Sequence, residues 1–346
     1  MRARYQTLAA ERPGWLVPGR ATANTQPTIV VGLVNNMSDA GLRAAERHVC
    51  TLLAAASRDF VVRLKLFSFP HIERSGPARE HIDRYYEDIA ELERDPPDGL
   101  IVTGAEPRSP GIVGEPHWPA LSRLADLVRD ASMPAIWSCL AAHAAVMRWD
   151  GIERVALGPK LSGVYECSID SAAHEIMRGT PDRWRVPHSR FFGLPDEALV
   201  ARGHRIVSWS PEGGADIFIK DDDVLSIFMQ SHPEYGPSTL PGEYRRDVTR
   251  YLDGGRELYP EIPHGCFGPH VERQLVALRQ RLDRGERDGH LEKLTAVIAG
   301  TTTEAPWSAT AVRIFANWLS YLDDRRADEG WRIRSRPAVY AGGREL

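Results

Sequence analysis

The sequence is poor in cysteine and lacks any long apolar segment. Its 346 residues include four cysteines, none of them in a Cys-x-x-Cys pair. Neither a disulfide framework nor a zinc site is therefore expected, and the thiols are expected to be reduced. The first 26 residues contain no apolar run long enough for a signal peptide or a membrane span. These absences predict a cytoplasmic protein without a membrane segment or a bound metal.

The chain also lacks a strong charge of either sign. Lys and Arg number 43, Asp and Glu number 47, and the formal net charge is -4. A nucleic-acid partner would require a dense basic block, so none is expected. Five arginines near the C-terminus lie in a polar segment that we expect to be solvated: Arg325, Arg326, Arg332, Arg334 and Arg336.

Strand and helix patterns alternate through the first half. Apolar, β-branched runs predict strands at 28–35, 60–69, 98–104 and 133–138. Segments with helical apolar spacing follow them, at 41–56, 85–94, 118–129 and 140–148. This alternation predicts an α/β fold, a doubly wound and mostly parallel sheet with flanking helices.

The second half contains shorter elements. Strand patterns lie at 161–169, 205–210, 215–220 and 224–229, separated by Gly, Pro and Asp turns. Helical patterns follow at 240–252, 269–284 and 308–322. We expect these strands to extend or decorate the main sheet, and the chain to end in helices.

One cysteine occupies a position where a side chain is presented rather than packed. Cys139 lies between the strand at 133–138 and the helix at 140–148, inside Trp137-Ser-Cys-Leu-Ala141. A tight strand-to-helix turn lifts the side chain off the sheet, and the helix N-terminus favours a thiolate. The carboxyl end of a strand is also where sites form in open α/β sheets. A small buried apolar residue is the alternative.

A second polar cluster follows another apolar strand. Ser231-His-Pro-Glu-Tyr235 comes directly after the strand at 224–229. A histidine that a carboxylate holds in one tautomer can activate a weak nucleophile. Pro233 favours a bend after His232, so whether Glu234 reaches the ring depends on that turn. An ordinary loop without a catalytic role is the alternative.

Taken with these two clusters, several ordered strings resemble the homoserine O-succinyltransferase family, also called homoserine transacylases. The two most specific are Lys160-Leu-Ser-Gly-Val-Tyr-Glu166 and Pro187-His-Ser-Arg190. The resemblance covers roughly residues 28–322 and implies the flavodoxin-like fold of class I glutamine amidotransferases. Its other strings are Ile101-Val-Thr-Gly-Ala105, Thr239-Leu240, Glu243 with Arg246-Asp247, and Asn317-Trp-Leu-Ser-Tyr321.

The resemblance implies a reaction in two steps. Cys139 would take the acyl group from an acyl-coenzyme A as a thioester, with His232 as general base and Glu234 holding the ring. The Leu140 N–H and the Gly104-Ala105 loop are the expected donors to the oxyanion. His232 would then deprotonate the acceptor hydroxyl, which attacks the acyl-cysteine. Acyl-coenzyme A is thus a co-substrate, no bound cofactor is expected, and the product would serve methionine biosynthesis.

Four further residues would bind the amino-acid acceptor. The family residues that match Glu243 and Arg246, three apart on the helix expected at 240–252, contact the ammonium and carboxylate of the acceptor. Lys160 and Ser189 match positions that line the same pocket. Read alone, the first two are compatible with a surface ion pair, Lys160 with a solvated lysine and Ser189 with a turn residue.

The clearest departure from the family is Arg108. That position is associated with acyl choice and usually holds Gly for succinyl or Glu for acetyl. A guanidinium there would pair bidentately with a succinyl carboxylate, which favours succinyl over acetyl transfer. Exposure to solvent or contact with coenzyme A phosphates is the alternative. The first loop, Asn35-Asn-Met-Ser-Asp39, also differs from the Met-Pro and lysine of the family.

Other functions stay open on sequence alone. Serine or another hydroxy-amino acid is an alternative acceptor, because one methylene is worth only about 1–3 kcal/mol of discrimination. A glutamine amidotransferase or cysteine hydrolase would share the fold and triad, but its elbow usually reads Gly-x-Cys-x-Gly, and the bulk of Trp137 argues against it. A noncatalytic protein on this scaffold would be expected to have lost a triad residue.

The matched region predicts one acyltransferase domain at 28–322, with an N-terminal arm at 1–27 and a polar C-terminal tail at 323–346. Trp15, Leu16 and Val17 form a small apolar cluster in the arm. We expect this cluster to pack on a partner subunit, because the resemblance implies a homodimer. The other expected partners are small-molecule substrates.

Overall fold

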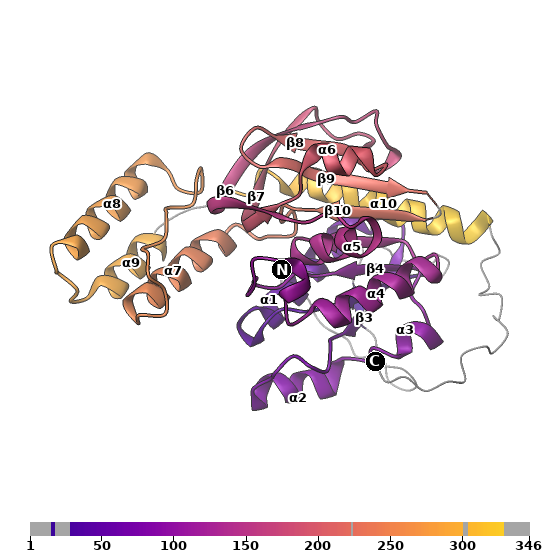
Figure 1. The fold of residues 1–346 in the computed structure, drawn as a ribbon, viewed down its shortest axis with the longest axis horizontal. Helices are drawn as coiled ribbons and strands as arrows, with labels where there is room; N and C mark the ends of the chain where they lie inside the picture. Colours follow the sequence, from indigo (N-terminus) through magenta and orange to yellow (C-terminus); the bar gives the residue numbers. More distant parts are fainter. Residues whose placement is uncertain (1–14, 18–27, 223, 300–303, 329–346) are drawn as a thin grey trace.

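The computed structural model describes residues 15–17, 28–222, 224–299 and 304–328 (Figure 1). Within these residues, ten strands form one sheet in the order β1-β3-β2-β4-β5-β10-β9-β8-β6-β7. The strands are β1 (Trp15–Val17), β2 (Thr28–Val34), β3 (Val61–Phe67), β4 (Gly99–Val102), β5 (Ala135–Ser138), β6 (Val155–Ile169), β7 (Arg183–Gly193), β8 (Arg205–Ser210), β9 (Gly214–Asp221) and β10 (Leu225–Met229).

The centre of the sheet is parallel. β3, β2, β4, β5 and β10 pair in the parallel sense, and their residues are largely buried because helices cover both faces. β9, β8, β6 and β7 continue the sheet in the antiparallel sense. The doubly wound α/β fold expected from the sequence is confirmed, and the second-half strands extend the main sheet.

Two pairs of helices cover the two faces. α1 (Asp39–Ala56) and α10 (Ser308–Asp328) share one core, while α4 (Trp118–Asp130) and α5 (Leu140–Asp150) share the other. The remaining helices are α2 (Gly76–Tyr85), α3 (Glu91–Arg94), η1 (Ile112–Gly114), η2 (Glu175–Met177), α6 (Asp196–Ala201), α7 (Thr239–Leu252), α8 (Pro269–Asp283) and α9 (His290–Ala299). In the described part of the chain, no helix has both the length and the apolar character needed to cross a bilayer.

α7, α8 and α9 build a third, smaller core. Tyr244 and Val248 of α7 pack with Leu275 of α8 and Leu294 of α9. In Figure 1, α8 and α9 extend to the left of the sheet, and α7 leads back to it. α7 therefore joins the end of the sheet to a helical extension.

The prediction of a helix at 85–94 is wrong. The helix forms earlier, as α2, with Pro77 in its first turn, where the missing N–H leaves no helical hydrogen bond unmade. Tyr86 is extended, and Glu87 bridges to Phe67 at the end of β3. Only the short α3 follows, because pairing with the sheet interrupts the helical spacing.

No strand was predicted at β7, which contains Pro187. It is the last strand of the sheet, and an edge strand tolerates a residue that donates no ladder hydrogen bond. Successive side chains of β7 point to opposite faces, so His188 and Arg190 share one face and Ser189 the other. α6 and α9 were also missed.

The arm and tail differ from expectation at their inner ends. Trp15–Val17 forms β1, which pairs with β3 of its own chain, so the expected homodimer stays a prediction. α10 continues past residue 322, and two of its arginines contact the fold instead of pointing freely into solvent. Arg326 Nη1 lies 3.7 Å from Asp98 Oδ2, and Arg325 Nη2 donates to Ser132 O at 3.1 Å. The rest of the arm and tail lies outside the described residues.

Candidate active site

The chain turns sharply after β5, and Cys139 lies at the turn. Its φ of 50° and ψ of -114° place a non-glycine residue where L side chains rarely lie. The Cys139 N–H donates to Met229 O at 2.8 Å, and Cys139 O accepts from the His143 N–H at 3.2 Å. The thiol is half-buried. The structure thus has the strand-to-helix turn expected from the sequence, with the thiol presented at the end of the sheet.

A glycine lets a second loop approach this turn. A Cβ atom on Gly104 would lie 3.0 Å from Leu140 N, 3.0 Å from Ser138 O and 3.2 Å from Cys139 Cβ. A larger residue would therefore push the loop that follows β4 away from the thiol. Gly104 and the Leu140 N–H lie beside Cys139, and Ala105 follows in the same loop, which is the arrangement that an oxyanion site needs.

His232 and Glu234 form a hydrogen-bonded pair after β10. His232 Nδ1 and Glu234 Oε1 are 2.9 Å apart. The His232 N–H donates to Pro187 O at 2.8 Å, and the Tyr235 N–H donates to His232 O at 3.1 Å, which closes a tight turn through Pro233. The bend at the proline therefore brings the carboxylate to the ring, as catalysis would require.

The same imidazole also interacts with the side chain of Cys139. Burial opposes a charge on His232, but the charge of Glu234 and the interaction with Cys139 outweigh it and raise the pKa of His232 well above its ordinary value. A cationic imidazole beside a sulfur is an arrangement that activates catalytic cysteines. The three side chains can therefore act as nucleophile, base and orienting carboxylate.

Tyr235 connects this triad to a second group of polar side chains. Its ring stacks on His232, with 4.4 Å between centroids and 15° between planes. Its hydroxyl donates to Glu243 Oε1 at 2.8 Å. Burial and the charges of Glu243 and Glu234 raise the pKa of Tyr235, so the hydroxyl keeps its proton. The sequence alone suggested no role for Tyr235. Its position directly after His-Pro-Glu was the only sign that it could belong to the site.

Three of the residues expected to bind an amino acid meet at one carboxylate. Ser189 Oγ donates to Glu243 Oε2 at 2.5 Å, and Lys160 Nζ lies 3.8 Å from the same oxygen. Lys160 comes from β6 and Ser189 from the neighbouring β7, whereas Glu243 and Arg246 come from α7. Strand pairing and the return of α7 thus bring together residues from three separate sequence strings.

The close partner of Arg246 is Asp247, for which the sequence suggested no role. Arg246 Nη2 lies 2.9 Å from Asp247 Oδ1, and Asp247 is only 4% exposed. Three more cations lie near this carboxylate: Lys160 at 3.1 Å, Arg256 at 3.4 Å and Arg250 at 4.0 Å. Burial opposes the charge, but Lys160 and Arg246 lower the pKa of Asp247. Asp247 therefore orients both Arg246 and Lys160.

Arg108 lies in an exposed loop after β4. Its N–H donates to both carboxylate oxygens of Glu115, at 3.1 Å and 2.9 Å, and the buried Glu115 pairs with Arg154 at 2.6 Å. Glu106, in the same loop, pairs with Arg250 of α7 at 2.6 Å. The backbone of the loop is thus anchored while the Arg108 side chain is exposed. Contact of this side chain with an acyl group stays a prediction.

Trp137 does not line the site. It is fully buried and packs edge-on against Trp149, with 5.5 Å between ring centroids. From the sequence we expected the bulk of Trp137 to argue against an amidotransferase. The side chain instead fills the core, so its bulk does not by itself exclude one.

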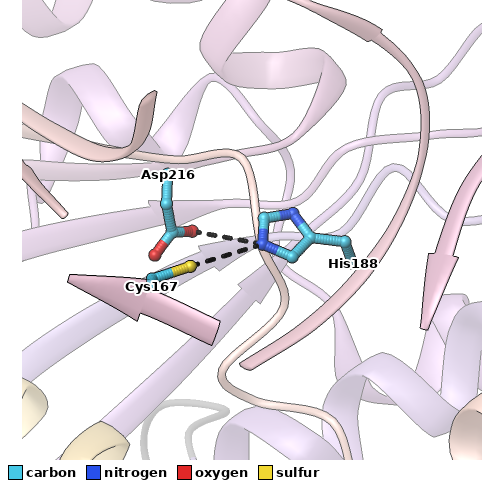
Figure 2. A group of neighbouring side chains, drawn as sticks. All are labelled: Cys167, His188 and Asp216. Atoms are coloured by element: carbon cyan, nitrogen blue, oxygen red, sulfur yellow. Dashed lines mark hydrogen bonds and ion pairs between the residues drawn. The ribbon is translucent and has the colours of Figure 1, made fainter. Parts of the chain in front are cut away.

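Three side chains of metal-ligating types lie together on the inner face of the antiparallel strands (Figure 2). His188 Nε2 is 3.9 Å from Cys167 Sγ and 3.8 Å from Asp216 Oδ1, and all three residues are buried. They come from β7, β6 and β9, so sequence spacing gave no sign of the cluster.

The protonation of this cluster opposes metal binding. Arg190 Nε donates to His188 Nδ1 at 3.4 Å, so the Nε2 atom that faces the other two side chains carries the proton. Burial raises the pKa of Cys167 and of Asp216, which favours their uncharged forms. We interpret the cluster as a buried polar group that packs behind Ser189 and supports β7.

The chain is similar to known proteins along most of its length. The family model described as homoserine O-succinyltransferase matches residues 2–327. The homoserine O-succinyltransferase of Rhodopseudomonas palustris is 41% identical over 296 residues, which cover 85% of this chain and 88% of that protein. The one of Methylorubrum extorquens is 39% identical over 303 residues, which cover 87% and 89%. Among solved structures, a glutamine amido transferase from Methylobacillus Flagellatus matches with a TM-score of 0.48 and 16% identity, covering 86% of this chain and 95% of that one.

We predict that Glu234→Gln lowers the pKa of His232 by about 1–3 units, the size of shift that an adjacent opposite charge produces. The variant removes the charge that favours the imidazolium, while an amide of the same size still reaches the ring. Nuclear magnetic resonance of the histidine ring protons over a pH series measures the change. Glu257→Gln, which removes an exposed carboxylate, is the control and should leave this titration unaltered.

The direction of the shift also sets how stability depends on pH. Because the folded-state pKa of His232 is raised, its contribution to stability is fully present below the unfolded-state value of about 6.5. The contribution is lost as the pH rises through the folded-state pKa, and in Glu234→Gln this loss should occur at lower pH. Identical His232 titrations in the variant and the wild type would contradict the role assigned to Glu234.

Proposed function

Because the chain belongs to the homoserine O-succinyltransferase family, we propose that this homoserine O-acyltransferase moves a succinyl group from succinyl-coenzyme A to the hydroxyl of homoserine, through an acyl-thioester on Cys139. The observation that carries the proposal is the triad, in which His232 hydrogen-bonds to Glu234 and interacts electrostatically with Cys139. The relatives that carry the name homoserine O-succinyltransferase align with most of the chain.

The first half of the reaction forms the thioester. His232 takes the proton of the Cys139 thiol, the sulfur attacks the thioester carbonyl, a carbon–sulfur bond forms, and the carbonyl electrons move to oxygen. The Leu140 N–H and the Gly104 loop stabilise this oxyanion. When it collapses, the bond to the sulfur of coenzyme A breaks, and His232 gives its proton to the departing thiolate. The close approach of Gly104 to Leu140 N supports this step.

The second half transfers the acyl group to the acceptor. His232 takes the proton of the acceptor hydroxyl as that oxygen attacks the acyl-cysteine, and Glu234 stabilises the imidazolium that forms. The intermediate then collapses, the carbon–sulfur bond to Cys139 breaks, and the sulfur leaves as a thiolate beside the protonated His232. Glu243 binds the acceptor ammonium and Arg246 its carboxylate. The pairing of Arg246 with Asp247 supports this assignment, because it fixes the guanidinium on the side of α7 that carries Glu243.

Cys139→Ala tests the proposal. We predict that wild-type protein incubated with succinyl-coenzyme A gains the mass of one succinyl group, and that addition of homoserine removes it. Cys139→Ala should gain nothing, whereas Cys266→Ala, which removes another half-buried thiol, should behave like the wild type. Intact-protein mass spectrometry measures both steps.

The same experiment distinguishes the alternatives. A panel of acceptors that includes serine identifies the one that discharges the acyl-enzyme fastest. Glutamine hydrolysis without consumption of any acyl-coenzyme A would support an amidotransferase and contradict the proposal.

We predict that Arg108→Gly and Arg108→Glu lower the ratio of succinyl to acetyl transfer. A guanidinium pairs with the succinyl carboxylate, and an acetyl group offers it no partner, so loss of the charge should cost about tenfold in this ratio. Arg108→Lys keeps the charge but loses the bidentate geometry and should fall between. Competition between the two acyl-coenzyme A donors measures the ratio. A ratio that is equal in all four proteins would contradict the succinyl role of Arg108.

A further inference from the structure

A cavity of about 450 Å³ lies between β6 and the helical extension. Its walls come from the stretch of β6 around Lys160, from α7, from the loop that follows α7, and from α8. Its volume lies in the range of small-molecule and cofactor sites. No step of the reaction described above uses this cavity.

The cavity adjoins the acceptor group through Lys160. Lys160 lines the cavity, and its ammonium lies 3.8 Å from Glu243, the carboxylate that also contacts Ser189 and Tyr235. Tyr235 in turn stacks on His232. A continuous line of contacting side chains therefore leads from the inner wall of the cavity to the catalytic base.

The inner wall carries surplus positive charge. Four cations lie within 4.0 Å of Asp247, and two of them, Lys160 and Arg256, line the cavity. The other carboxylates in contact with these cations are Glu243 and Glu106. Four cations thus face three carboxylates, and one positive charge is left to attract an anion.

The outer wall combines a further guanidinium with apolar surface. Arg279 of α8 lies over the ring of Tyr259, with 5.4 Å from its central carbon to the ring centroid. Its carboxylate neighbour, Glu261, is 3.7 Å away and 74% exposed, so solvent weakens this pair. Leu258 is 75% exposed, the most exposed large apolar side chain among the described residues. An exposed leucine beside a guanidinium whose only carboxylate pair in this wall is weakened by solvent suits a ligand that has both apolar and anionic parts.

We propose that this cavity binds the coenzyme A part of the acyl donor, an inference that rests on the function proposed above. The phosphates pair with Arg279 and Arg256, and the pantetheine arm lies along Leu258 and Tyr259. The thioester then passes Lys160 to reach Cys139. Arginine suits this role because its planar donors match phosphate oxygens two at a time.

The position of the cavity also suits the order of the reaction. The donor thiol leaves before the acceptor attacks, so the two substrates use the triad in turn. With the donor entering past Lys160, the coenzyme A thiol can leave into the cavity while Glu243 and Arg246 stay available for the amino acid.

Two donors with the same acyl group test the proposal. Succinyl-coenzyme A carries the phosphates, whereas the succinyl thioester of N-acetylcysteamine has the same reactive bond without phosphates or adenine. Intact-mass spectrometry follows the rate at which each donor acylates Cys139. In Arg279→Gln, we expect the second-order rate constant to fall about tenfold with succinyl-coenzyme A and to change less than about twofold with the truncated donor.

Two further variants sharpen the test. Leu258→Asp places a negative charge where the donor should lie, on a side chain too exposed to affect folding. It should slow acylation by succinyl-coenzyme A but not acylation by the truncated donor. Arg273→Gln removes an exposed cation from the same helix, outside the cavity, and should change neither rate.

The outcomes separate this proposal from the function on which it rests. Equal effects of Arg279→Gln on both donors, or no effect on either, would overturn the cavity assignment while leaving the acyltransferase intact. Wild-type protein that neither donor acylates would overturn the proposed function, and the cavity assignment with it.

Discussion

The backbone of Cys139 is the constraint on which the site depends. A non-glycine residue at a φ of 50° is strained, and the turn persists because β10 holds it through the hydrogen bond from the Cys139 N–H to Met229 O. β10 also leads directly into His232. One strand pairing, in which Met229 lies opposite Ser138, therefore fixes both the nucleophile and the position of its base. Gly104 completes the site because a larger residue would crowd this turn, with its Cβ only 3.0 Å from Leu140 N.

The residues proposed for chemistry and those proposed for recognition come from different halves of the sheet. The parallel strands supply the cysteine and the loop of Gly104, as is usual at the carboxyl edge of an open α/β sheet. The antiparallel strands β6 and β7 supply Lys160 and Ser189, which α7 meets with Glu243. The buried Asp247 gathers cations from both sides, so the group depends on its charge. A scaffold of this kind can change its substrates without disturbing the triad.

The sequence predicted the parallel half well, because buried parallel strands are continuous apolar runs and each ends in a recognisable turn. It missed β7, whose Pro187 is tolerated only because the strand lies at the edge. It placed a helix at 85–94, where Glu87 instead pairs with the sheet. The motifs supplied the candidate triad and acceptor residues, but the contacts of Asp247, and the meeting of Cys167 with Asp216, depend on strand order, which local patterns do not encode.

The central claim is that Cys139 carries the acyl group between donor and acceptor. Its most direct test is exchange of isotopically labelled coenzyme A into succinyl-coenzyme A without any acceptor present. A thioester on Cys139 predicts exchange at a rate comparable to turnover, because coenzyme A can reverse the first step alone. Exchange that requires homoserine would mean direct transfer between the two substrates and would contradict the claim.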